Sequence, residues 1–260
     1  MNKKLTIILL LGTLLITTLG VFLTFFNKSE NESVEVEADQ LNIDCFNRSG
    51  QYLSYEDDKY YSSIGVDVSE HNETIDFEKV KDSGIDFVFM RIGRRGYYEG
   101  LLQEDIYFEE YYTKAKEAGL KIGVYFFSQA INENEAKEEA QFALKILDGR
   151  ELDLGIAYDF EDITYDIGRA NNISKEQTTK NALSFFDTIG DEYPVILYSN
   201  NDCINKYFDM EILSKYDLWY AQYYEYPQCN YKIKAWQYTD SGEVPGLGFD
   251  ADINIMFIEK

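Results

Sequence analysis

Histidine is almost absent from this sequence, which has His71 alone among 260 residues. One imidazole leaves little scope for a Ser-His-Asp or Cys-His arrangement, and no Gly-x-Ser-x-Gly motif is present. The cysteines, Cys45, Cys203 and Cys229, are too widely spaced for a Cys-x-x-Cys metal motif. Cys203 and Cys229 could form a disulfide if the domain is extracellular. We expect no metal and no cofactor, which leaves carboxylates as the candidate catalytic groups.

Basic residues are also scarce, because 24 Lys and Arg stand against 47 Asp and Glu, a formal net charge of −23. Proteins that bind nucleic-acid phosphates carry a basic excess, so nucleic acid is excluded as a partner. A phosphate-cradling loop is missing too, since Gly93-Arg94-Arg95-Gly96 lacks both the Lys-Ser/Thr step and a third glycine. This Gly-Arg-Arg-Gly segment is interpreted as a loop at a strand end.

The first 28 residues predict a signal anchor or signal peptide. Leu5 to Phe26 carries no charge and is long enough, at about 1.5 Å per residue, to cross a hydrocarbon core of about 30 Å. The run exceeds a signal-peptide core and lacks a clear Ala-x-Ala site, which favours an uncleaved anchor over a secreted protein. Lys3 and Lys4 before it place the rest of the chain outside the cytoplasm. We expect the membrane to be a partner through this anchor.

The remaining chain divides by composition into a stalk and a domain. Residues 29–58 are polar and acidic and predict a solvated stalk, although it stays open whether Cys45 to Tyr55 packs on the domain. Residues 59–260 predict one α/β domain, because apolar runs alternate with helical patterns. Expected helices cover 76–83, 104–118, 133–147 and a segment opening at Ser174, where Gln177 gives a capping-box spacing.

The predicted strands indicate a mostly parallel sheet. Strands expected at 64–68, 86–92, 121–127, 154–161 and 194–198 are each followed by a helix or a long connection, which indicates an α/β barrel or a doubly wound sheet. The last three, at 218–223, 233–238 and 253–257, leave no room for full helices between them. We therefore expect the last strands to be partly antiparallel.

Paired carboxylates give the first functional signal. Asp159 and Glu161 lie two residues apart at the end of an apolar run, so a strand would place them on one face and Tyr158 and Phe160 on the other. Neighbouring carboxylates raise one another's pKa, as an acid/base pair requires. Two further acids, Asp67 and Asp252, stand at strand ends. In barrels such residues converge at the carboxyl ends of the strands, although a lone Asp there equally often caps a turn.

The order and spacing of several motifs resemble the glycoside hydrolase family 25 lysozymes, which are N-acetylmuramidases. The resemblance runs from about Ser63 to the C-terminus. It rests on Gly65-Val66-Asp67-Val68-Ser69, Ile75-Asp76-Phe77, Gly84-Ile85-Asp86-Phe87-Val88, Ala118 to Phe127, Asp159-Phe160-Glu161, Trp236-Gln237-Tyr238-Thr239 and Asp252-Ile253-Asn254.

The resemblance implies a modified TIM-like β/α barrel, with the last strands antiparallel, that cuts the β-1,4 bond between N-acetylmuramic acid and N-acetylglucosamine in peptidoglycan. By motif position Glu161 would be the general acid, and Asp159 would stabilise positive charge or orient the substrate N-acetyl group. Asp67 and Asp252 would complete the acidic floor. The nucleophile stays open, since it depends on the separation of the carboxylates. The substrate-binding candidates are Tyr125, Tyr198, Tyr220, Gln222 and Trp236.

Two departures from the family pattern keep alternatives open. The chain has Phe126 where the family often has His, and Glu70-His71-Asn72 where it has an aromatic residue and Gln. These departures are the support for a non-catalytic peptidoglycan-binding module on the same fold. A chitinase-like barrel would carry a longer Asp-x-x-Asp-x-Asp-x-Glu run, but Ala157 stands where that run needs an acid.

Overall fold

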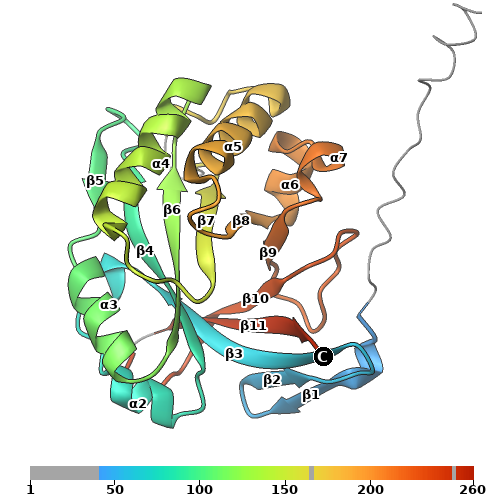
Figure 1. Cartoon of the computed structure of the whole chain (residues 1–260). Helices are drawn as coiled ribbons and strands as arrows, with labels where there is room; N and C mark the ends of the chain where they lie inside the picture. The colour runs from blue at the N-terminus through green and yellow to red at the C-terminus, as the bar shows by residue number, and fades with distance from the viewer. Residues whose placement is uncertain (1–40, 164–166, 248–249) are drawn as a thin grey trace, which may run out of the picture. The chain divides into compact units, whose positions relative to one another are not determined.

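The computed structural model describes residues 41–163, 167–247 and 250–260, and within them a closed barrel of eight strands (Figure 1). Six neighbouring pairs around the ring are parallel, and only β11 runs antiparallel to both of its neighbours, β10 and β3. The α/β barrel is confirmed, with its antiparallel part reduced to one strand. In ring order the strands are β3 (Tyr60–Val68), β11 (Ala251–Glu259), β10 (Ala235–Gly242), β9 (Asp217–Ala221), β8 (Val195–Asn200), β7 (Gly155–Phe160), β6 (Lys121–Ser128) and β4 (Phe87–Arg95).

Helices connect the parallel strands and cover the outside of the barrel (Figure 1). They are α2 (Phe77–Asp82), α3 (Phe108–Glu117), α4 (Glu133–Leu147), α5 (Lys175–Ile189) and the short α6 (Asn201–Tyr207) and α7 (Met210–Leu213). The helix predicted from Glu104 begins later, because β5 (Leu102–Glu104) first pairs back on β4 as a hairpin. Among the described residues, no helix lies between β9 and β10 or between β10 and β11, as the short spacings indicate.

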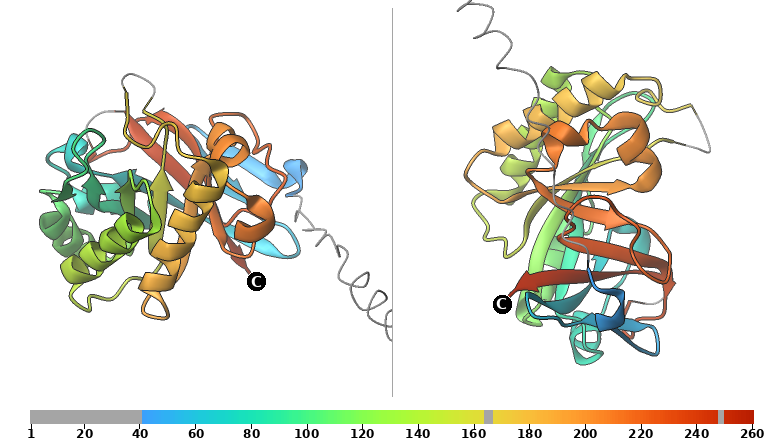
Figure 2. Two further views of the ribbon diagram at one scale, coloured as in Figure 1. Left: turned by 90° about the horizontal axis from the view of Figure 1, so that it is seen from above. Right: turned by 90° about the vertical axis from the view of Figure 1, so that its right-hand side faces the viewer.

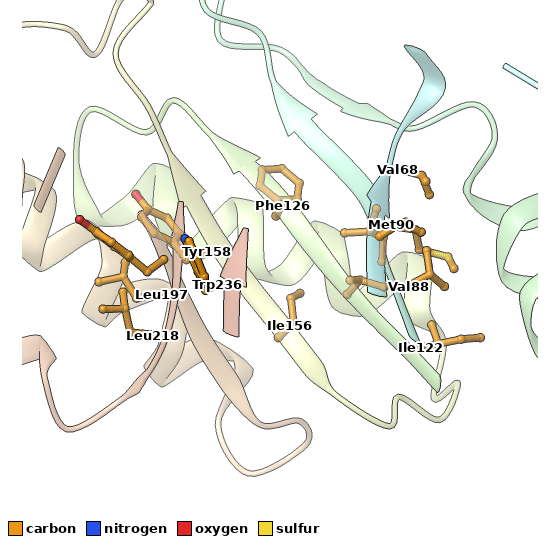
Figure 3. Close-up of a cluster of buried hydrophobic side chains, with 14 of the residues drawn as sticks. Val68, Val88, Met90, Ile122, Phe126, Ile156, Tyr158, Leu197, Leu218 and Trp236 are labelled. Atoms are coloured by element: carbon orange, nitrogen blue, oxygen red, sulfur yellow. The ribbon is translucent and has the colours of Figure 1, made fainter. Parts of the chain in front are cut away.

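Side-chain alternation along the strands produces two cores. Outward-facing residues, among them Val88, Ile156 and Tyr158, join the larger core beneath the helices (Figure 3). Inward-facing residues such as Phe89 and Trp219, whose rings stack with centroids 4.4 Å apart, fill the barrel. Gly65 is required there, because a Cβ atom would lie 2.2 Å from the Phe87 ring. Because Tyr158 belongs to the outer core, it faces away from Asp159, as predicted.

Helix α5 begins with one of the two hydrogen bonds of the predicted capping box. The Ser174 Oγ accepts from the Gln177 backbone N–H at 3.2 Å. The Gln177 side chain, however, donates to Glu133 and Asn181, each at 2.8 Å, instead of reaching back to Ser174. Only half of the capping box forms, because tertiary partners on α4 and α5 compete for the glutamine amide.

A two-stranded hairpin, β1 (Phe46–Ser49) and β2 (Tyr52–Tyr55), precedes the barrel and lies beside its C-terminal strands, away from α4 and α5 (Figure 2). Leu53 and Tyr55 are buried, and the Phe46 ring contacts four aromatic rings, of Tyr55, Tyr226, Trp236 and Phe257. From the sequence, this segment fell within the stalk expected at residues 29–58, and it was left open whether Cys45 to Tyr55 packs on the domain. The structure shows that its aromatic residues pack on the barrel.

Replacing Phe46 with leucine is expected to lower the stability of the domain by about 1–2 kcal/mol, since leucine keeps much of the apolar area but loses the edge-to-face contacts. A fall in Tm of a few degrees, measured by calorimetry, would be the readout. Ile43→Ala, at a site that is 56% exposed in the same segment, is the control and should leave Tm unchanged. Equal Tm values for Phe46→Leu and the wild type would mean that the hairpin does not stabilise the barrel.

The predicted anchor, within residues 1–28, lies outside the described residues. Across the ranges that are described, no helix combines the length and the apolar character needed to cross a bilayer. All three cysteines are described and are free thiols, so the possible Cys203–Cys229 disulfide is not formed.

Candidate active site

Four carboxyl groups meet at one end of the barrel. Asp67 is the last residue but one of β3 and Asp252 is the second residue of β11. Asp159 lies in β7, and Glu161 follows β7 directly. Because β11 runs antiparallel to β3, its start lies beside the end of β3, and Asp252 and Asp67 are direct cross-strand partners. All four side chains line one cleft of about 430 Å³, called here the central cleft. The structure thus brings together the four acids that the sequence singled out.

Asp67 is held by amide donors whose orientation is fixed by their other partners. Its Oδ2 accepts from Gln237 Nε2 and Asn254 Nδ2, both at 2.8 Å. Trp219 Nε1, which can only donate, occupies the Asn254 oxygen at 2.7 Å. The hydroxyls of Tyr198 and Tyr223 donate to the Gln237 oxygen, each at 3.0 Å. Two N–H groups therefore point at one carboxyl oxygen, an arrangement that favours the anionic form of Asp67.

The pKa values of the acids follow from burial and from this geometry. Burial raises the pKa of Asp67 to about 6, against the lowering effect of its two amide donors. The pKa of Asp252 rises to about 8, through burial and then the neighbouring charges of Asp67, Asp240 and Glu161. Burial also raises the pKa of Glu161, partly offset by a hydrogen bond with the Asn200 side chain. Near neutral pH the cleft therefore carries fewer negative charges than it has carboxyl groups.

Asp159 lies deepest in this set, and only 6% of its surface is exposed. Burial, then the charges of Glu161 and Asp67, raise its pKa well above the usual range, while Arg91 acts in the opposite direction. Its Oδ1 atom is buried and has no hydrogen-bond partner in the protein. A buried carboxyl oxygen without a partner is costly, so a ligand that donates an N–H or O–H to it would be favoured.

The backbone of Glu161 is held from the neighbouring strand. The fully buried Gln129 follows β6, and its Nε2 donates to the Glu161 carbonyl oxygen at 3.0 Å. Arg169 Nη1 in turn donates to the Gln129 carbonyl oxygen at 3.0 Å, while both of its terminal nitrogens bind the Glu135 carboxylate. Glu161 therefore projects from a fixed segment, although it lies just beyond the end of the strand.

The raised pKa of Asp252 predicts a pH-dependent stability effect. Its carboxyl group keeps a proton more tightly in the folded protein than in the unfolded chain, so its contribution to stability is full below about pH 4. That contribution is lost as the pH rises through about 8. Asp252→Asn removes the ionisation, so we expect its Tm, relative to the wild type, to rise between pH 5 and pH 9 in calorimetry. A Tm difference that is constant with pH would contradict the shift.

The five predicted substrate-binding residues fall into two groups. Tyr125 and Tyr198 line the central cleft, and Gln222 lines an adjoining cavity. Tyr220 and Trp236 do not fit this role, because both side chains are almost fully buried in the core outside the barrel. The Tyr220 hydroxyl donates to the Gln228 carbonyl oxygen, and Trp236 Nε1 to that of Gln222. Strand alternation explains why the prediction fails for these two residues. Their neighbours in the chain, Trp219 and Gln237, face into the barrel, so Tyr220 and Trp236 face outward.

Several site residues were not singled out from the sequence. Gln237 and Asn254 lie within motifs that were quoted for the resemblance, yet only the structure shows them bound to Asp67. Arg91 lies 7% exposed in the cleft, with its guanidinium 2.9 Å from Glu70 and from Asp105. Its signal was a single charge within the apolar run from Phe87 to Ile92. His71 also lines the central cleft.

Two further cavities adjoin the central cleft and share Glu161 with it. One, of about 520 Å³, shares His71, Arg91, Phe127 and Glu161 with it and is called here the arginine arm. The other, of about 470 Å³, is lined by Asn200, Asn201, Gln222 and Tyr224 and shares Glu161, Tyr198 and Tyr223 with the cleft. Glu161 lines all three cavities, so it lies where they adjoin.

The arrangement does not suggest a metal centre. Over the described ranges, no group of three or more His, Cys, Asp or Glu side chains is placed to hold a metal ion. Carboxyl groups at the strand ends of a β/α barrel, in a polar groove with aromatic walls, instead define a glycoside hydrolase site.

Comparisons with known proteins specify the class. The family model described as glycosyl hydrolases family 25 matches residues 66–247, and the chain belongs to this family. An autolytic lysozyme of Clostridium acetobutylicum is 31% identical over 196 residues, which cover 73% of this chain and 54% of that protein. The chain therefore spans about half the length of this curated relative.

Solved structures show the same fold. The modular autolysin LytC of Streptococcus pneumoniae, in complex with a synthetic peptidoglycan ligand, matches with a TM-score of 0.65 and 26% identity. That match covers 76% of this chain and 47% of the LytC chain. A family 25 glycosyl hydrolase from Bacillus anthracis has a TM-score of 0.63 and 20% identity, covering 80% of this chain and 94% of the other.

Proposed function

We propose that this protein hydrolyses the β-1,4 bond between N-acetylmuramic acid and N-acetylglucosamine in peptidoglycan. The observation that carries the proposal is the position of Glu161, a carboxyl group with a raised pKa that lies where three cavities of one groove meet. Adjoining cavities that share Glu161 leave room for sugar units beyond the one whose bond is cut, which suits a polymeric substrate. The similarity to an autolytic lysozyme, and to an autolysin that binds a synthetic peptidoglycan ligand, supports the same substrate.

Glu161 acts in this proposal as the general acid. A glycosidic oxygen is a poor leaving group and needs a proton as the bond breaks, so the acid must still be protonated near neutral pH. Burial of Glu161 raises its pKa in the required direction. The hold of Gln129 on its backbone fixes where the proton is delivered.

Asp159 is proposed to bind the substrate 2-acetamido group or to stabilise positive charge at the anomeric carbon. An acetamido N–H is the kind of donor that its unpartnered Oδ1 lacks in the free protein. Asp67, held by its two amide donors, is proposed to carry the negative charge of the central cleft. Asp252, its cross-strand partner, is proposed to be the fourth carboxyl group of this acidic set.

The departures from the family pattern give little support to a non-catalytic module. Phe126 is fully buried and packs its ring against Phe142 and Phe185 of α4 and α5, so it faces away from the cleft. Only the Glu70-His71-Asn72 turn borders the site, and it leaves the four acids in place.

We also propose that residues 1–28 hold the enzyme at the cell membrane, with the catalytic domain on the wall side. The charge-free run after Lys3 and Lys4 supports this. The mass of the mature protein and its partition between membrane and soluble fractions test it. A mature protein without residues 1–28, found in the soluble fraction, would indicate secretion instead.

Incubation of the full chain with purified peptidoglycan tests the activity. New reducing ends should appear on N-acetylmuramic acid, identified by borohydride reduction and mass spectrometry of the fragments. Reducing ends on N-acetylglucosamine would show that the other glycosidic bond is cut. Binding of the chain to peptidoglycan without any new reducing ends between pH 4 and pH 9 would overturn the proposal in favour of a binding module.

A further inference from the structure

The Gly93-Arg94-Arg95-Gly96 segment borders the arginine arm, where no catalytic role explains it. Arg94, Arg95, Gly96, Tyr97 and Tyr98 all line this cavity. Arginines at this cavity stand out because the whole chain has a formal charge of −23. A cationic side chain next to the cleft of so acidic a protein would attract an anionic part of the substrate, while the acidic floor attracts none.

The three arginines of β4 differ in how fully their charges are satisfied. Arg91 and Arg95 are only 7% and 4% exposed, and each is paired with a fully buried carboxylate, Asp105 and Glu139 respectively. Arg94 keeps 35% of its side chain exposed. Its carboxylate partner is Glu70, whose Oε1 lies 2.8 Å from Arg94 and also 2.9 Å from Arg91. One carboxylate is thus shared between two guanidinium groups.

Three acids also line the arm. Besides Glu161 they are Glu99 and Asp162, and Asp162 is already bound by Lys206 at 2.6 Å and by the Tyr207 hydroxyl. A guanidinium has five N–H donors, of which Arg94 uses Nε toward Gln103 and Nη1 toward Glu70. Donors therefore remain available on the exposed part of the group.

The Arg94 side chain is also held in position. Arg94 and Gln103 are cross-strand partners in the β4–β5 hairpin, and the Arg94 Nε donates to the Gln103 side-chain oxygen at 3.1 Å. Gly93 permits this close pairing, because a Cβ atom there would lie 2.9 Å from the Gln103 carbonyl oxygen. An arginine fixed on a strand loses less entropy on binding than one on a mobile loop.

We propose that Arg94 binds a carboxylate that the substrate carries beside the sugar in the central cleft. This inference rests on the proposed function and adds a second recognition element to it. Muramic acid bears a lactyl group on its ring, and that group ends either in a free carboxylate or in a peptide with carboxylates of its own. Both sources offer the planar anion that a guanidinium binds with two parallel hydrogen bonds.

Equilibrium binding to soluble glycan fragments tests this without relying on turnover. The full chain with Glu161→Gln would be compared with the same chain also carrying Arg94→Gln. The fragments are glycans with intact stem peptides, glycans from which the peptides have been removed, and the latter after conversion of the lactyl carboxylates to neutral amides. Arg48→Gln, an equal charge change on the exposed face of β1, is the matched control.

Arg94→Gln should weaken binding of the carboxylate-bearing fragments about tenfold and leave the neutral amide fragment unchanged. A loss on the peptide-free glycan identifies the lactyl carboxylate, and a loss confined to stem-bearing fragments identifies the peptide. Arg94→Lys should restore only part of the affinity, because lysine keeps the charge but not the fork. The dependence on Arg94 should also weaken as salt is added.

Equal affinities for Arg94→Gln and Arg48→Gln on every fragment would overturn the inference. So would a loss of the same size on the neutral amide fragment, since that would indicate a structural effect through Glu70. If the wild-type chain releases no reducing ends but these affinities still differ, the proposed catalysis fails while the carboxylate site stands.

Discussion

Replacing Glu161 by glutamine is expected to lower kcat on peptidoglycan by about 10²- to 10⁴-fold, the range that a general acid contributes. Glutamine has nearly the same shape and can still form hydrogen bonds, but it has no proton to give to the leaving oxygen. Because the backbone at this position is held by Gln129, the fold and the affinity for glycan should be preserved. Reducing-end release at substrate saturation is the measurement.

A matched change on the surface separates chemistry from charge. Glu176 lies on α5 with 77% of its side chain exposed and pairs only with Lys180 in the next turn. Glu176→Gln should therefore have wild-type kcat and KM. In the wild type, kcat should fall as the pH rises through the raised pKa of Glu161, because the acid loses its proton. A Glu161→Gln enzyme with wild-type kcat would show that another group donates the proton.

Asp159→Asn is expected to reduce kcat by about 10²- to 10³-fold, as the loss of one preorganised electrostatic contact to a transition state does. Asparagine replaces one carboxyl oxygen by an NH₂ group and cannot ionise, so it offers one acceptor oxygen fewer to an acetamido N–H and cannot develop the negative charge that stabilises an oxocarbenium-like centre. The effect should appear in kcat measured on the same peptidoglycan.

The same substitution, Asp159→Asn, should not lower the thermal stability of the fold, although it lowers kcat. The folded-state pKa of Asp159 is raised, so its contribution to stability is lost as the pH rises from the unfolded pKa toward that raised value. Asparagine avoids this loss, and the Tm of Asp159→Asn at pH 7 should equal or exceed that of the wild type. The exposed Asp191→Asn is the control and should change neither quantity. A lower Tm together with the lower kcat would point to a structural role for Asp159 instead.

Much of the barrel follows from local pattern. The parallel strands and their helices were predicted within a few residues, because buried strands appear as apolar runs and the helices have regular spacing and caps. The hairpins β1–β2 and β4–β5 were missed. Their strands are short and mixed in polarity, and what stabilises them is packing on distant residues, such as Phe46 against Phe257.

The candidate site divides in the same way. Asp67, Asp159, Glu161 and Asp252 could be proposed from the sequence, since each stands at the end of a recognisable strand. Tyr220 and Trp236 were placed at the groove because a motif gives their position but not the face on which they lie. Gln237 and Asn254 escaped notice, because an amide becomes informative only when its partner is known.

The sequence by itself determined that this protein is an acidic α/β chain whose candidate chemistry depends on carboxyl groups, because residue type, strand period and charge are local properties. Only the tertiary structure decided that these groups share one cleft. It also decided that Asp67 is held by two amides, that Asp159 keeps an oxygen without a partner, and that Arg94 shares its counter-ion. The reason is physical: burial and pairing depend on residues that are distant in the chain, and these set each group's pKa and free hydrogen-bonding capacity.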